Sequence, residues 1–169
     1  GDPQSASPEL GQRFDPRNIS ADQVYRNLRA GNAYVTSGPI IDFSIFGYPM
    51  GSTIAWEAGE PVEVDLRVRC PVEMQLAYVD VNKGGLFATR HTFVQPAVGE
   101  IYDWTPTEGR NRYQIRRDEI LSVIVRGARR LTPMNPYNSF DEPFVPLAIS
   151  NPIWFDTDGN GRHDAPPVD

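Results

Sequence analysis

One short stretch of alternation constrains the fold of this chain more than any other feature. Residues 62–69 read Val-Glu-Val-Asp-Leu-Arg-Val-Arg, so apolar and charged side chains alternate without interruption. Successive side chains of a β-strand point to opposite faces of the sheet, and one face of an antiparallel sheet commonly meets water. The stretch therefore predicts a strand whose even-numbered residues, among them Val62 and Leu66, face a core while its charges face solvent.

Further short apolar runs follow the same style, and most of the sixteen prolines and fourteen glycines lie between them. Strands separated by turn residues at regular spacing indicate a sandwich, and the lack of interleaved helices argues against a parallel α/β fold. We therefore predict a mainly β protein, an antiparallel β-sandwich of the immunoglobulin-like kind. The other expected strands are 33–36, 40–46, 74–81 and 86–93 joined by a hairpin at 82–85, a pair formed by 111–116 and 120–126, and finally 147–150 and 153–155.

A single short helix is expected near the N-terminus, over residues 21–30. Ser20 is a good N-cap, Gln23 completes a capping box, and Gly31 is a suitable stop. Residues 1–17 are polar and contain three prolines, which indicates a flexible tail or linker. The predicted organisation is thus a tail at 1–17 and one β-sandwich domain at 18–169.

The charge balance narrows the classes of partner. Sixteen basic and twenty-two acidic residues give a net charge of −6, whereas nucleic-acid binding needs clustered Lys and Arg. We therefore expect no nucleic-acid partner. No apolar run approaches the roughly 18 residues of a membrane span, so none is expected. Cys70 is the one cysteine, which rules out a disulfide within the chain.

The sharpest chemical motif lies near the C-terminus, where residues 156–164 read Asp-Thr-Asp-Gly-Asn-Gly-Arg-His-Asp. Oxygen-bearing side chains stand at loop positions one, three, five and nine, with Gly161 at the sharp turn and a backbone carbonyl at position seven. Ca²⁺ takes six to eight such oxygens. Pro167 stands where an EF-hand has its bidentate Glu, so the motif resembles the shorter calcium loops. The expected ligands of a structural Ca²⁺ are Asp156, Asp158, Asn160, Arg162 and Asp164; the alternative is a polar turn that binds no metal.

Residues for catalysis are scarce by comparison. His91 and His163 are the two histidines, and the chain contains neither a His-x-His pair nor a nucleophile elbow. We therefore predict no catalytic residue and no activity for the chain alone. The long stretches 95–109 and 132–146 are rich in aromatic residues, which either plug the ends of the sandwich or form a platform for a sugar or peptide.

Three segments together resemble a known family. They are Leu-Arg-Ala-Gly-Asn-Ala-Tyr-Val-Thr-Ser-Gly-Pro at 28–39, Val-Asp-Val-Asn-Lys-Gly-Gly at 79–85, and Ala-Ile-Ser-Asn-Pro-Ile-Trp-Phe-Asp-Thr-Asp-Gly-Asn-Gly at 148–161. They resemble the C-terminal β domain of PHP-type metallohydrolases of the CehA/McbA (carbaryl hydrolase) group, whose metal ligands sit in a preceding barrel.

The resemblance implies an accessory domain that packs on the catalytic PHP barrel of a metal-dependent hydrolase, and it transfers no catalytic residue to any position here. The alternative is a calcium-stabilised module that binds a carbohydrate or another small ligand.

Overall fold

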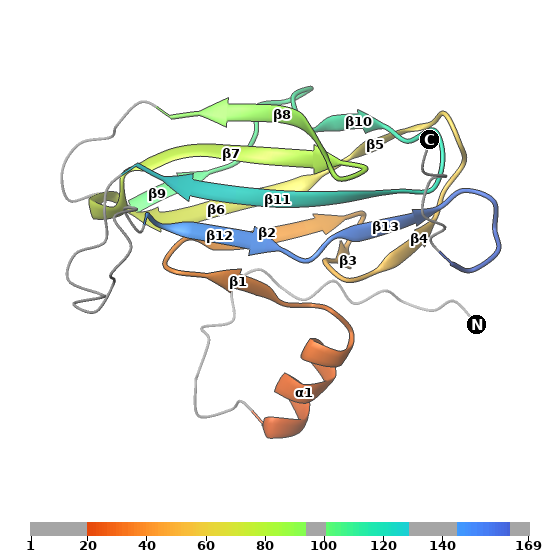
Figure 1. Ribbon diagram of the computed structural model, residues 1–169, viewed down its shortest axis with the longest axis horizontal. Coiled ribbons are helices and arrows are strands. Elements are labelled where there is room, and N and C mark those ends of the chain that lie inside the picture. Colours follow the sequence, from red (N-terminus) through yellow and green to blue (C-terminus); the bar gives the residue numbers. More distant parts are fainter. Residues whose placement is uncertain (1–19, 94–100, 129–144, 163–169) are drawn as a thin grey trace, which may run out of the picture.

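The computed structural model describes residues 20–93, 101–128 and 145–162, which form a β-sandwich with one α-helix. The predicted fold class is thereby confirmed (Figure 1). The helix is α1 (Ala21–Arg29), and a 3-10 turn covers Val72–Met74. The strands are β1 (Tyr34–Thr36), β2 (Ile40–Ile45), β3 (Tyr48–Pro49), β4 (Thr53–Ala55), β5 (Pro61–Glu63), β6 (Asp65–Pro71), β7 (Leu76–Lys83), β8 (Leu86–Thr92), β9 (Ile101–Trp104), β10 (Arg112–Gln114), β11 (Glu119–Gly127), β12 (Leu147–Ser150) and β13 (Ile153–Asp156).

The larger sheet is built around β11. One edge of β11 pairs with β7, which continues into the β7–β8 hairpin across Gly84 and Gly85, as the sequence predicts. The other edge pairs with β13 along its first residues and with β12 along its last residues. β1 extends the sheet beyond β12, and β4 adds to β13 in parallel.

The second layer is the sheet β3-β2-β6-β9, accompanied by the separate pair β10–β5. Because side chains alternate between the two faces along each strand, each layer turns one face toward the core. The pattern of β11 shows this clearly, with Leu121, Val123 and Val125 fully buried. The largest side chains with almost no exposure are Phe155, Ile41, Ile45, Leu76, Ile115, Leu121 and Ile153.

The alternating stretch 62–69 departs from the prediction in one respect: it is two strands. β5 pairs with β10, whereas β6 pairs with β2 and β9. The change of sheet occurs at Val64, whose N–H donates to the carbonyl of Asn111 (2.9 Å) and whose carbonyl accepts from Asn111 Nδ2 (3.0 Å). Val64 stays buried at the crossover, so the alternation holds across the break.

Two further strand predictions need correction. The residues at 111–116 do not pair with 120–126, because β10 joins β5 and β11 joins β7, β12 and β13. The stretch 95–109 is also more than a loop, since β9 pairs with β6 there. Its Tyr102 is buried and its Trp104 packs against the core, so these two rings belong to the core through a strand and not through a loop. The tail at 1–17 and the rings at 137, 140 and 144 lie outside the described residues.

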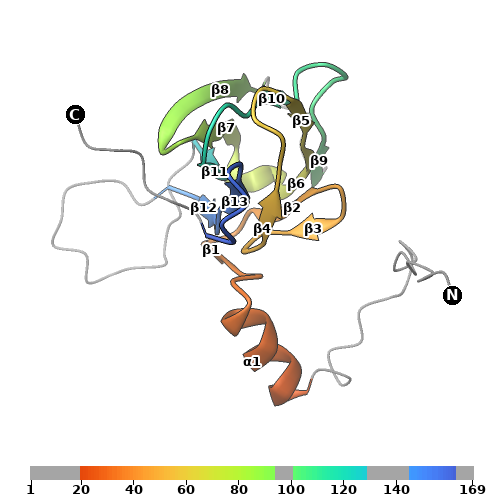
Figure 2. The same ribbon diagram turned by 90° about the vertical axis from the view of Figure 1, so that its right-hand side faces the viewer.

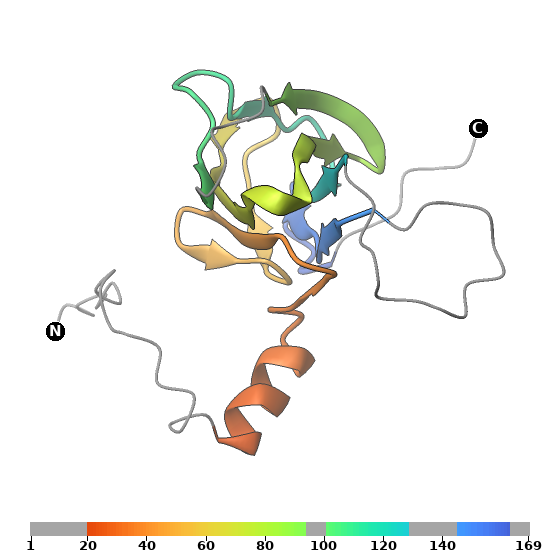
Figure 3. The same cartoon turned by 90° about the vertical axis from the view of Figure 1, so that its left-hand side faces the viewer.

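The predicted helix is confirmed, but it does not pack on the sandwich. Ser20 Oγ accepts from the N–H of Gln23 at 3.1 Å, and none of the nine residues of α1 is buried. Both end views show α1 standing away from the two layers (Figures 2 and 3). Within the described residues, no helix has the length and apolar character needed to cross a membrane.

Candidate functional site

The acidic loop begins where β13 ends. Asp156 is the last residue of that strand, and only 6% of its surface is exposed. Its Oδ1 accepts from the N–H of Gly159 and its Oδ2 from the N–H of Gly161, both at 2.8 Å. Gly159 and Gly161 have φ angles of +73° and +78°, a left-handed conformation that favours glycine. The two glycines thus let the chain curl around the carboxylate of Asp156.

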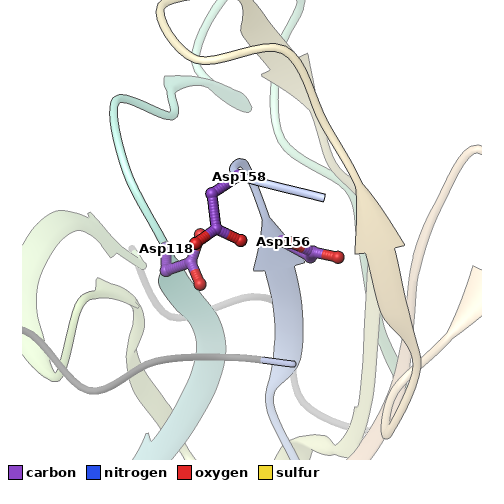
Figure 4. Close-up of side chains that lie close together, drawn as sticks. All are labelled: Asp118, Asp156 and Asp158. Carbon is purple, nitrogen blue, oxygen red and sulfur yellow. The ribbon is translucent and has the colours of Figure 1, made fainter. Parts of the chain in front are cut away.

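The carboxylate of Asp118 approaches the loop from a different part of the chain. Asp118 precedes β11, whose Glu119 pairs with Phe155 of β13, so Asp118 arrives beside the start of the loop. Its Oδ1 accepts from both the N–H and the hydroxyl of Thr157, each at 2.8 Å. Asp118, Asp156 and Asp158 lie close together (Figure 4). Each contributes one carboxylate oxygen, and these three oxygens lie within 4.8 Å of one another.

This separation fits a single cation. Ca²⁺ lies 2.3–2.6 Å from its oxygens, so two ligands of one ion stand at most about 5 Å apart. One ion can therefore contact the carboxylates of Asp118, Asp156 and Asp158 together. Without a cation, three negative charges this close repel each other. The backbone N–H groups that point at Asp156 offset part of that repulsion.

The structure describes four of the five predicted ligands, all in one loop. The carboxylates of Asp156 and Asp158 belong to the cluster, and Asn160 and Arg162 follow them in the loop with exposed side chains. Asn160 donates from its N–H and its Nδ2 to the two oxygens of Asp158, each at 3.0 Å. Its Oδ1 accepts from the N–H of Arg162 at 2.7 Å. Asp164 lies outside the described residues.

Asp118 is the member of the cluster that sequence reasoning missed, because Asp118-Glu119 reads as an ordinary acidic turn. What places Asp118 in the site is the register between β11 and β13, and strand pairing leaves no mark in the sequence of either strand. Glu119 serves the fold instead: it is buried, accepts from the N–H of Arg116 (2.9 Å), and lies 3.5 Å from Lys83 Nζ.

His91 lies in the core and outside this cluster. It is 6% exposed, and its ring centroid stands 4.9 Å from that of Trp104. Burial lowers the pKa of His91, the nearby charge of Arg110 lowers it further, and Asp80 opposes both. Its Nε2 is buried without a hydrogen-bond partner among the described residues. His163 is outside those residues.

A second feature is apolar surface that the described residues leave largely exposed. On α1, Val24, Tyr25 and Leu28 are 45%, 61% and 62% exposed. On the outer face of the larger sheet, Val35 of β1 is 77% exposed and stands opposite Ile149 of β12, itself 41% exposed. α1 leads directly into β1, so the helix face and this strand face belong to one end of the molecule.

The direction of α1 is set at its junction with β1. Gly51 approaches so closely that a Cβ on it would stand 2.4 Å from the carbonyl oxygen of Ala30 and from the carbonyl carbon of Gly31. Asn151 Nδ2 donates to the Gly31 carbonyl at 2.8 Å, and the Asn151 N–H donates to that of Ala33 at 3.3 Å. Contacts at its C-terminal end therefore hold the helix outward, and the described residues leave its apolar face exposed.

Comparison of the chain with models of known families, with curated proteins and with solved structures finds no match.

Proposed function

We propose that this chain is an accessory β-sandwich domain that packs on the catalytic barrel of a PHP-type, metal-dependent hydrolase. The supporting observation is α1: its apolar face is exposed while its direction is fixed by the contacts around Gly51 and Asn151. The resemblance at 28–39 and 148–161 supplies the kind of partner.

Elementary energetics favour a partner for this helix. Isolated helices shorter than about 12–15 residues are marginal in water, and α1 has nine residues. Most helical stability in proteins comes from packing an amphipathic face, yet Val24, Tyr25 and Leu28 bury little here. Complete burial of one such side chain contributes about 1.5–3 kcal/mol. A surface that covers all three would therefore stabilise both the helix and the complex.

The first step is to sequence the gene that encodes this chain. The proposal requires that the same gene also encodes a PHP-type barrel with a His-x-His ligand pair. Produced separately and mixed, barrel and chain should form a one-to-one complex in size-exclusion chromatography. Leu28→Glu should abolish the complex, because it places a charge on the apolar face of α1.

Gln23→Glu is the matched control, since it adds the same charge on the other side of the helix, in the first turn, where acidic residues are favourable. It should leave the complex intact. A gene product without the barrel, or equal binding by both variants, would contradict the proposal.

A second function is favoured by the position of Asp118. We propose that the loop 156–164 holds a structural Ca²⁺, with Asp118, Asp156 and Asp158 as ligands, and that the chain is a calcium-stabilised module. Binding to the folded state alone raises its stability by about 2.7 kcal/mol when free Ca²⁺ is a hundredfold above the dissociation constant. Mg²⁺ should do less, because it requires regular geometry and keeps its waters.

Thermal melts in chelator and in millimolar Ca²⁺ test this second proposal. Asp158→Ala should remove the rise in Tm produced by Ca²⁺. Asp118→Asn is the sharper variant, because it removes a charge but keeps the Oδ1 acceptor that Thr157 uses. It should weaken the response to Ca²⁺ while the Tm in chelator stays the same or rises. An unchanged Tm of the parent chain in Ca²⁺ would show that the loop is a polar turn only.

A further inference from the structure

The outer face of the smaller sheet carries an open hollow of about 1030 Å³, whose lining is part polar and part apolar. Its floor is formed by β2 and β6, which pair directly along Ile40–Ser44 and Asp65–Arg69. One rim is the segment 32–34 between α1 and β1, and the other is Thr105 and Pro106 after β9. Sites for small molecules commonly enclose about 300–1,000 Å³, so the hollow has room for a ligand of more than one ring.

The side chains on the floor follow from strand alternation. Ile41 and Phe43 of β2 point into the core, so Asp42 and Ser44 point outward. In β6, Leu66 and Val68 are buried in the same way, which turns the charged residues outward. The lining therefore includes two acidic and two basic side chains and a hydroxyl, namely Asp42, Asp65, Arg67, Arg69 and Ser44, beside apolar residues that include Ile41, Phe43 and Met50.

Cross-strand ion pairs hold the two guanidinium groups in place. Arg69 Nη2 lies 3.0 Å from Asp42 Oδ2. Arg67 forms a bidentate ion pair with Asp103 of β9. All four side chains are 41–55% exposed. Exposed pairs of this kind contribute little to stability. Their clearer effect is to fix hydrogen-bond donors at defined positions on the floor.

Much of the hydrogen-bonding capacity of the floor is uncommitted. A guanidinium has five N–H donors, and Arg69 uses one of them within the described residues. The hydroxyl of Ser44 and the carboxylate of Asp65 have no hydrogen-bond or ion-pair partner in the part of the chain that the structure describes. The floor therefore offers both hydrogen-bond donors and hydrogen-bond acceptors that are not used by neighbouring side chains.

We propose that this hollow binds a neutral carbohydrate. The guanidinium groups of Arg67 and Arg69 face the carboxylates of Asp103 and Asp42, and Asp65 adds a further carboxylate, so the floor carries no surplus of positive charge that would favour an anion. Sugar hydroxyls both donate and accept, which matches a floor that offers both functions. The ring of Tyr34, half-buried at the rim, offers an apolar surface for the C–H face of a sugar ring. The site is separate from α1 and from the acidic loop, so it depends on neither function proposed above.

The test uses the whole chain labelled with ¹⁵N and four probes: cellohexaose, xylohexaose, maltohexaose and a sulfated heparin hexasaccharide. At least one neutral probe at millimolar concentration should shift the amide signals of β2 and β6. Two variants should weaken that binding at least tenfold. Asp65→Ala removes an acceptor, and Ser44→Tyr fills the hollow from an outward-facing position. Glu57→Ala is the control, because it removes an exposed carboxylate elsewhere and should bind as the parent does.

Three results would overturn the proposal. The first is no shift with any neutral probe. The second is a set of shifts confined to residues outside β2, β6 and the two rims. The third is binding of the sulfated hexasaccharide alone, which would assign the hollow to anions through Arg67 and Arg69. Preserved spectra of the two variants would show that lost binding does not reflect unfolding.

Discussion

Adding one methyl group at Gly51 tests whether the junction between α1 and β1 fixes the direction of the helix. Gly51→Ala places a Cβ 2.4 Å from the carbonyl oxygen of Ala30 and from the carbonyl carbon of Gly31. Both atoms are backbone, so neither can rotate away as the end of a side chain would. Gly51 also has a φ of +90°, where a non-glycine residue is strained. We expect the variant to push the helix junction away from the turn between β3 and β4.

Gly59→Ala separates the two contributions. Gly59 has a similar φ of +99°, but a Cβ there would meet nothing within 4 Å. Both variants carry the strain of the left-handed conformation, about 1–2 kcal/mol. Gly51→Ala adds the cost of overpacking, typically about 1–3 kcal/mol. The difference between the two variants is therefore expected to be about 1–3 kcal/mol.

Urea unfolding followed by circular dichroism measures this difference, with the m-value as a check that the same surface is exposed on unfolding. For a chain of this length, 1 kcal/mol corresponds to about 2–4 °C in Tm. Gly51→Ala should therefore melt several degrees below Gly59→Ala. Equal destabilisation by the two substitutions would mean that the junction gives way freely, and the argument for a fixed direction of α1 would fail.

Three further results are expected. Because burial lowers the pKa of His91, with Arg110 acting in the same direction, its contribution to stability is present above about pH 6.5 and is lost as the pH falls through the folded pKa. Thermal melts from pH 8 to pH 5 should show this loss in the parent chain and less of it in His91→Gln. Arg90→Ala should destabilise more than Asp80→Ala, by about 1 kcal/mol in urea unfolding, because it leaves the buried carboxylate without its two 2.7 Å bonds; the reverse order would contradict this. Burial raises the pKa of the Cys70 thiol to about 11, so iodoacetamide at pH 8 should label it only in unfolded protein.

The local parts of the fold could be predicted because their causes are local. The cap of α1 depends on Ser20 and Gln23, three residues apart, and the hairpin depends on Gly84 and Gly85 between two strands. The alternation at 62–69 likewise reports which side chains face the core. In each case the physical preference acts within a few neighbouring residues, and the sequence contains it whole.

Pairing partners could not be predicted in the same way. Val62 and Leu66 are both buried, and their positions in the alternating pattern would be the same whether they belonged to one strand or to strands in two different sheets. The crossover at Val64 is set by its contacts with Asn111, which is distant in sequence. Asp118 enters the acidic cluster for the same reason, through the register of β11 on β13. The motif contains Asp156 and Asp158 but gives no sign that Asp118 joins them.

Residues 28–39 and 148–161 lie at opposite ends of the described chain, yet in the structure they contact each other. β1 pairs with β12 along Tyr34–Thr36, and Asn151 bonds the carbonyls of Gly31 and Ala33. The N–H of Gly51 then donates to the carbonyl of Pro152 at 2.9 Å, so the turn that braces the helix also rests on this segment.

Each of these two segments therefore contacts the other at the point where α1 leaves the sandwich. β13 carries the same segment on to Asp156, where the acidic loop begins. The helix that we propose as the docking element and the loop that we propose as the calcium site are therefore built on one continuous piece of chain, residues 147–162, which braces the first at one end and forms the second at the other.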